Sequence, residues 1–227
     1  MNEQAGKFLG LIKFFREEWK LDSLINGCFY CNTPEFYRMS GDEGVSDKFE
    51  SCVFSYRTSR NDEPVTLNVN GIDLNDVLGL TVHNGGDGDA WMHCWYALWV
   101  PKDQADLDET KANIERMQSE FGKLYAFIPA REIKTFHETL SKLTDKPISC
   151  KEVVYSSDKE KWGTFCKSLS YAYQREYRFS IGECEPHNTT EYIITSTDGF
   201  SDVIVKNPKI QLQHNTTGQV WLEISAD

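Results

Sequence analysis

The chain has 227 residues, of which 40% are hydrophobic and 13% aromatic, and no Pro/Gly/Ser-rich linker divides it, so we expect one globular domain over residues 1–227. A net charge of −11 works against extended nucleic-acid binding, because neutralising a phosphate backbone takes an excess of Lys and Arg. No apolar run approaches the roughly 20 residues of a membrane-spanning helix, so no membrane partner is expected. Seven scattered cysteines and an N-terminus unlike a signal peptide predict a cytoplasmic protein.

The N-terminal half is expected to begin with a helix and continue in strands. Residues 7–19 predict an amphipathic helix, because apolar side chains recur at helical spacing: Phe8, Leu11, Ile12, Phe15 and Trp19. A turn is expected to begin at Pro34. Strands are expected at 28–32, 51–59, 65–74, with Asn70-Gly71 at a hairpin tip, and 90–100, the most apolar segment and a candidate central strand.

The C-terminal half mixes both kinds of element. Helices are expected at 106–120 and 130–143, and strands at 123–129 and 150–155. Ser157 and Glu160 have capping-box spacing, which predicts a helix through Trp162 and Leu169. The remaining third is rich in strand patterns. The fold class is therefore α+β, with a mixed or mostly antiparallel sheet and flanking helices.

The stretch YAYQREYRFSIG, residues 171–182, contains the strongest candidate for chemistry. If a strand begins near Ala172, its alternation points Gln174, Glu176 and Arg178 to one face. If a helix instead continues to residue 176, Gln174 and Glu176 do not share a face. A purely structural ion pair between Glu176 and Arg178 would explain the same residues.

The pattern Gln174-x-Glu176 resembles the signature of mono-ADP-ribosyltransferases. The resemblance implies NAD as cofactor, with Glu176 stabilising positive charge on the ribose as nicotinamide leaves and Gln174 helping to orient the nucleophile. This predicts an NAD-cleaving transferase with Glu176 and Gln174 as catalytic residues.

The same resemblance implies a cofactor site on early strands. Mono-ADP-ribosyltransferases have an Arg or His on an early strand, a position that Arg38 or Arg57 would fill. They also have a Ser/Thr-rich strand, which SYRTS at residues 55–59 would supply through Ser55. Tyr30 is a further candidate for a cofactor contact, because it lies in an aromatic and cationic early segment.

Four segments together resemble a family of uncharacterised bacterial and phage proteins: NGCFYCNTPEFYR at 26–38, SDKFES at 46–51, MHCWYALW at 92–99 and QREYRFSIG at 174–182. The likeness covers about residues 20–182 and implies a shared fold and a role in phage–host conflict, such as a toxin or a phage-defence component. It leaves open a different class of function, a non-catalytic protein that binds another protein. Six tryptophans and ten tyrosines would suit such an interface.

Other residues admit both a functional and a structural interpretation. Asp47 and Glu50 form an acidic loop that could bind a substrate or a cation, or could be turn chemistry. His83 precedes the Gly-rich loop NGGDGD, whereas His93 lies in the most apolar segment and is expected to be structural. Cys28 and Cys31 lack a second ligand pair, so no metal is expected.

Overall fold

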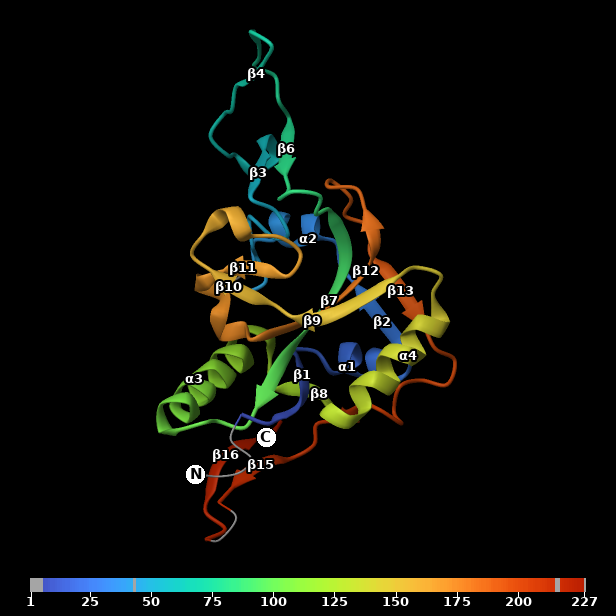
Figure 1. Cartoon of the computed structure of the whole chain (residues 1–227). Coiled ribbons are helices and arrows are strands. Elements are labelled where there is room, and N and C mark those ends of the chain that lie inside the picture. The colour runs from blue at the N-terminus through green and yellow to red at the C-terminus, as the bar shows by residue number, and fades with distance from the viewer. Residues whose placement is uncertain (1–5, 43, 215–216, 227) are drawn as a thin grey trace.

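A six-stranded sheet organises the fold (Figure 1), and the structure, a computed structural model, describes residues 6–42, 44–214 and 217–226. The strand order is β14-β8-β1-β7-β12-β9, and each neighbouring pair is antiparallel. The predicted α+β class is confirmed. The six strands are β1 (Phe8–Phe15), β7 (Asp89–Trp99), β8 (Leu124–Pro129), β9 (Ile148–Glu152), β12 (Glu176–Cys184) and β14 (Val205–Lys206).

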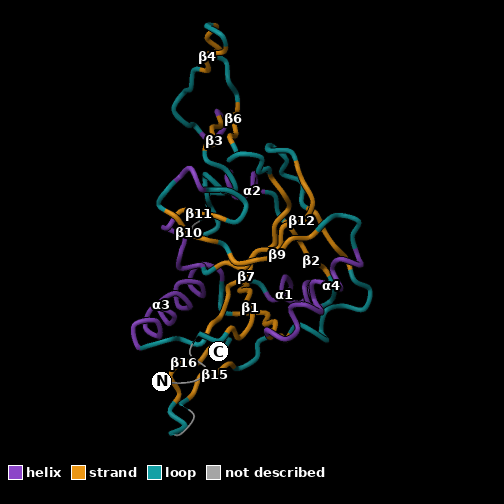
Figure 2. Tube along the Cα trace, viewed as in Figure 1, coloured by secondary structure: helices purple, strands orange, loops and turns teal. Residues whose placement is uncertain are grey.

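Helices cover the two faces of this sheet, so the strands run through the centre and the helices lie at the periphery (Figure 2). The helices are α1 (Glu18–Ile25), α2 (Pro34–Met39), α3 (Gln104–Phe121) and α4 (Ile133–Leu143). Helices α1 and α4 pack into one core, around Trp95 and Phe179. Helix α3 packs into a second core, around Ile12 and Tyr96. Successive side chains of β1 and β7 point alternately into the two cores, so both faces of these strands are buried.

Five two-stranded ribbons surround the sheet: β2 (Cys28–Cys31) with β13 (Tyr192–Thr195), β3 (Phe54–Arg57) with β6 (Gly79–Val82), β4 (Leu67–Val69) with β5 (Ile72–Leu74), β10 (Val154–Ser156) with β11 (Cys166–Ser168), and β15 (Ile210–Gln213) with β16 (Val220–Ile224). The β4–β5 hairpin forms the end of an arm that projects from the body, with β3 and β6 at its base (Figure 1). Its tip is Asn70-Gly71, as predicted, and both residues have positive φ.

The predicted helix over residues 7–19 is wrong, because Phe8–Phe15 form strand β1 between β7 and β8. A strand that is buried on both faces carries apolar side chains at consecutive positions. Such a run also satisfies helical spacing, so periodicity could not separate the two structures. Glu18–Ile25, which follow, do form a helix.

The predicted helix from Ser157 is also wrong. Asp158, not Ser157, accepts from a backbone N–H, that of Glu160, and this closes only a 3₁₀ turn over Lys159–Lys161. The chain then reverses, and the backbone N–H of Val154 donates to the carbonyl of Phe165 at 2.9 Å. The other predicted strands and helices are confirmed with shifted ends, except that the strand predicted at 150–155 divides between β9 and β10, which lie in different sheets. The turn expected from Pro34 is helix α2. No helix among the described residues is long and apolar enough to span a membrane.

Candidate functional site

Two separated acidic segments meet at one buried lysine, Lys167 on β11. Its Nζ lies 3.7 Å from Asp47, 3.2 Å from Glu50 and 3.2 Å from Glu176. Arg178 lies beside it, with Nη1 2.9 Å from Glu50 and Nη2 2.6 Å from Glu176. All five residues are buried. We call these five the Lys167 cluster. The expected ion pair between Glu176 and Arg178 is therefore present, within a larger network.

Gln174 and Glu176 both contact Lys167 Nζ, although they lie in different secondary-structure elements. Gln174 ends a 3₁₀ helix over Leu169–Gln174, Arg175 adopts a left-handed conformation with φ 38°, and β12 begins at Glu176. The two residues share neither one strand nor one helix. Nevertheless Lys167 Nζ donates to Gln174 Oε1 at 3.1 Å and to Glu176 Oε1 at 3.2 Å. The reversal at Arg175 thus brings both predicted catalytic side chains together.

The cluster holds three carboxylates against two cations, and the pKa values of Glu176 and Asp47 shift in opposite directions. Burial raises the pKa of Glu176, but the charges of Arg178 and Lys167 outweigh burial and hold the pKa at about 2. Burial, followed by the charge of Glu50, raises the pKa of Asp47 to about 6. Glu176 is therefore ionised at neutral pH. Asp47 is the carboxyl whose ionised form the cluster disfavours.

Replacing Asp47 by Asn should make stability less dependent on pH. A carboxyl whose pKa is raised by folding stabilises the protein below its unfolded pKa, and this contribution is lost as pH rises from 3.8 through about 6. Asp47→Asn should therefore gain stability relative to the wild type over that interval, by up to about 3 kcal/mol. Urea unfolding on both sides of the interval measures it, with the exposed Asp198→Asn as control. A stability difference between Asp47→Asn and the wild type that is constant with pH would contradict this assignment.

A cleft of about 550 Å³ opens beside the cluster, where strands β1 and β7 separate. Their pairing ends at Ile12 and Tyr96, while β1 stays paired with β8 through Phe15. Five polar side chains from several elements line the cleft beside the cluster: Lys13 of β1, Glu50, Lys167, Gln174 and Glu176.

The loop that carries Gly44 forms another wall of the cleft. Gln174 Nε2 donates to the Gly44 carbonyl at 2.9 Å, so this wall is tied to the catalytic candidate. Gly44 has φ +77°, and a Cβ there would lie 2.3 Å from Glu120 Oε2. Only glycine fits this position without displacing its neighbours.

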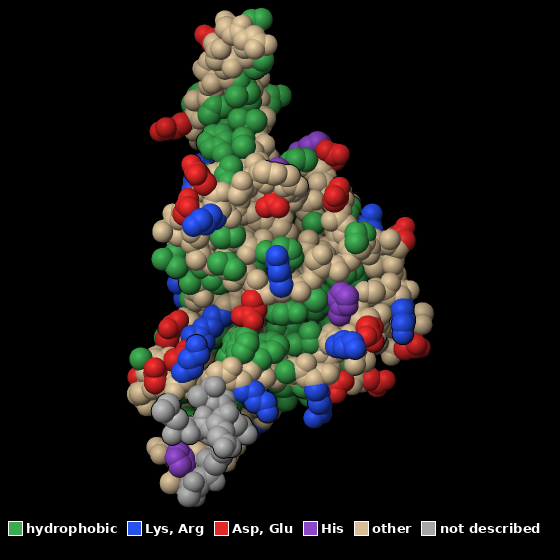
Figure 3. All heavy atoms as spheres, viewed as in Figure 1, with side chains coloured by type: hydrophobic (Ala, Val, Ile, Leu, Met, Phe, Trp, Pro, Cys, Tyr) green, Lys and Arg blue, Asp and Glu red, His purple; other side chains and the backbone are tan. Residues whose placement is uncertain are grey.

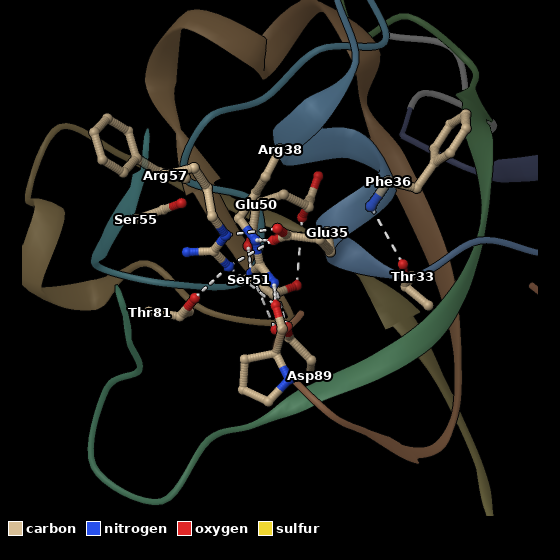
Figure 4. Close-up of polar contacts among 12 residues, drawn as sticks. Thr33, Glu35, Phe36, Arg38, Glu50, Ser51, Ser55, Arg57, Thr81 and Asp89 are labelled. Atoms are coloured by element: carbon tan, nitrogen blue, oxygen red, sulfur yellow. Dashed lines mark hydrogen bonds and ion pairs between the residues drawn. The ribbon is translucent and has the colours of Figure 1, made fainter. Parts of the chain in front are cut away.

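A second buried ionic network, shown in Figure 4, lies at the base of the arm. Glu35 accepts from Arg38 Nε at 2.9 Å and from Arg57 Nε at 2.6 Å. Asp89 pairs with Arg38 and also with His83 Nε2 at 2.9 Å. We call these five residues the Arg38 cluster. It joins helix α2, the arm and the start of β7.

The structure brings some predicted site residues together and separates others. Glu176, Gln174 and Glu50 line the cleft, and Asp47 and Arg178 contact those that do. The four predicted cofactor contacts and His83 are not among the described residues that line it: Arg38, Arg57 and His83 belong to the Arg38 cluster, Ser55 is buried against Arg60, and Tyr30 is 44% exposed on β2.

The guanidinium groups of Arg38 and Arg57 are engaged within the protein. Besides their carboxylate partners, both donate to the carbonyl of Pro186, at 2.7 and 3.1 Å. Arg57 also donates to Thr81 Oγ1 at 2.8 Å. These arginines hold the arm to the body, and a cofactor phosphate would have to displace a protein acceptor to bind them.

Two lysines of the cleft, Lys13 and Lys167, were not predicted from the sequence. Lys13 is the single charged residue within FLGLIKFF, and a charge inside a buried apolar strand needs a partner or a ligand. The single lysine within this apolar run therefore indicated a site. Lys167 has no such signal, because CKS is a short polar strand like many exposed ones.

The histidines and cysteines have structural surroundings. Burial lowers the pKa of His93 well below its usual value, its Nδ1 contacts the Tyr30 carbonyl at 2.8 Å, and its ring stacks on Phe29. All seven cysteines are free thiols, Cys28 and Cys31 included. Within the described ranges, no group of three or more His, Cys, Asp or Glu side chains has a metal-binding arrangement.

Comparisons with protein-family models, with curated proteins and with solved structures found no match to this chain.

Proposed function

We propose that the chain is an enzyme that cleaves the bond between nicotinamide and ribose in NAD and transfers the ADP-ribose, with the cleft as its active site. One observation carries the proposal. Glu176 is an ionised carboxylate, fixed on the wall of the cleft with Gln174 beside it. The cleft volume of about 550 Å³ is typical of small-molecule sites.

The reaction needs a fixed negative charge more than it needs a strong base. As the bond from ribose C1′ to the nicotinamide nitrogen breaks, the electron pair leaves with nicotinamide and positive charge develops on the ribose. A carboxylate already in place stabilises this charge without reorganising. Arg178 and Lys167 hold Glu176 in position, and three carboxylates against two cations leave the Lys167 cluster with net negative charge.

The second half of the reaction adds a nucleophile to C1′ of the ribose. Its proton passes to solvent or to a base as the new bond forms. Water as nucleophile gives free ADP-ribose, and a protein side chain gives a modified acceptor. Gln174 Nε2 donates to the Gly44 carbonyl and to the Tyr173 hydroxyl, while Oε1 accepts from Lys167 at the cleft wall. The remaining acceptor site on Oε1 could receive a hydrogen bond from the nucleophile. Either outcome suits a toxin or defence component, in line with the resemblance over residues 20–182.

Incubation of the purified protein with NAD labelled in the adenylate part tests this proposal. Nicotinamide release should accompany either free labelled ADP-ribose or label transferred to protein in an added lysate. NAD that remains intact, with and without lysate, would contradict the proposal.

The arm favours a second candidate function, binding to a protein partner. Its side chains Val69, Ile72, Leu74 and Leu78 are between 46% and 78% exposed, and Figure 3 shows hydrophobic side chains gathered along it. Residues 61–78 contain four acidic residues and no Lys or Arg. We infer that a partner of the arm would combine an apolar surface with positive charge.

A photo-crosslinking residue at Ile72 should capture this partner in cells, because Ile72 is 66% exposed at the hairpin tip. The same residue at Lys134, on the exposed face of α4, is the matched control. Capture at Ile72 alone, in both the wild type and the Glu176→Gln background, would support a binding role that is independent of catalysis. Equal capture at both positions would contradict it.

A further inference from the structure

Lys13 is the one lysine on a strand of the central sheet that faces the cleft, and its charge is unmatched. Its Nζ donates to the backbone carbonyl of Cys94 at 2.9 Å. Among the residues that the structure describes, no carboxylate forms an ion pair with it. Lys167 in the same cleft has three carboxylates within 4 Å. Two of the three protons on the Lys13 ammonium group are therefore free to bind a ligand.

An unmatched ammonium group in this place is costly without a ligand. Burial lowers the pKa of Lys13, and the more distant charge of Glu176 offsets only part of that effect. The Lys13 side chain is only partly exposed, and the one protein acceptor of its Nζ among the described residues is the Cys94 carbonyl. A bound anion would supply the missing counter-charge. Within the part of the chain that the structure describes, no side chain supplies this counter-charge, so a bound ligand would complete the site.

We propose that Lys13 is an anion subsite of the cleft and binds a phosphate or diphosphate group of the ligand. Only the identity of that ligand as a nucleotide rests on the proposed function. Lys13 lies on β1 and Glu176 on β12, with strand β7 between them in the sheet. The cleft therefore offers a cation and an anionic cluster at separate places.

The rest of the cleft lining carries both signs of charge. Arg16 and Lys20 are exposed, but Lys20 pairs with Glu17 at 2.6 Å, and Glu17, Asp42 and Glu120 line the cleft as well. Attraction of an anion would therefore rest on Lys13 itself. A ligand such as NAD carries negative charge on its diphosphate and positive charge on its nicotinamide ring. The subsite would place the diphosphate at Lys13 and leave the ring for the side of Glu176.

Calorimetric titration with ADP-ribose, which lacks the scissile bond, tests this subsite separately from cleavage. Lys13→Gln should bind ADP-ribose at least about 10-fold more weakly than the wild type, because a hydrogen bond to a charged group is lost. Lys134→Gln, on the exposed face of α4, should bind like the wild type. Inorganic pyrophosphate should show the same dependence on Lys13. Adenosine, which has no phosphate, should not.

A second measurement needs no variant and so does not depend on the folding of Lys13→Gln. An anion that binds Lys13 raises its pKa, so the wild type should take up protons on binding ADP-ribose at alkaline pH, as shown by titrations in buffers of different ionisation enthalpy. Equal affinity in wild type and Lys13→Gln, no proton uptake, or no binding of either anion would overturn the subsite. Lys13-dependent binding without NAD cleavage would instead reject the proposed function and keep the subsite.

Discussion

Glu176→Gln should lower the rate of NAD cleavage by about 100- to 1,000-fold, as expected when one fixed group that stabilises transition-state charge is removed. The amide keeps the shape of the side chain but loses its charge. The Lys167 cluster then has two carboxylates against two cations, so its charges remain balanced and the fold should persist. Nicotinamide release at saturating NAD measures the effect.

The matched control is Glu183→Gln, which removes a carboxylate from the exposed part of the same strand. It should leave both turnover and thermal unfolding unchanged. A thermal melt of Glu176→Gln shows whether the variant is folded, which separates lost chemistry from lost structure. A folded Glu176→Gln protein that releases nicotinamide at the wild-type rate would reject Glu176 as the catalytic carboxylate.

Lys167→Met should cost about 3–5 kcal/mol of stability at neutral pH, because it leaves buried carboxylates without their shared cation. Asp47, Glu50 and Glu176 would then have Arg178 alone. The pKa values of Asp47 and Glu176, which the charge of Lys167 lowers, should rise in the folded variant. Groups whose pKa is raised by folding stabilise the protein at low pH and lose that contribution as pH rises. The loss of stability should therefore be smaller in acid than at neutral pH.

Urea unfolding of Lys167→Met at acidic and neutral pH measures both the size and the sign of this effect. Lys134→Met is the control, since the Lys134 side chain is 87% exposed and its pairing with Glu138 is an ordinary surface contact. A loss below about 1 kcal/mol, within the range of surface ion pairs, would show that the Lys167 cluster is not held by its charges.

Part of the site could be predicted from the sequence because its residues lie in recognisable local patterns. The acidic loop of Asp47 and Glu50 and the run from Gln174 to Arg178 each carry several polar side chains beside aromatic ones. Their meeting at one lysine could not be predicted, because it depends on how distant segments pack. Lys167 itself lies on a two-stranded ribbon that the sequence predicted as helix.

The predicted cofactor contacts show the opposite case. Arg57 lies on an early strand, as the family resemblance requires, whereas Arg38 lies on helix α2. Buried carboxylates engage both: Glu35 pairs with both and Asp89 with Arg38. A sequence shows where a charge lies along the chain and not which partner neutralises it. Lys13 was overlooked for a related reason. The segment around it was predicted as an amphipathic helix, in which a lysine belongs on the wet face, whereas in a strand buried on both faces it points into the cleft.

A crystal structure of Glu176→Gln with intact NAD bound tests the proposed active site. We expect NAD in the cleft between β1 and β7, with C1′ of the nicotinamide ribose next to residue 176 and the diphosphate next to Lys13. NAD bound outside the cleft, or bound within it with this ribose away from residue 176, would show that the cleft is not the site of NAD cleavage.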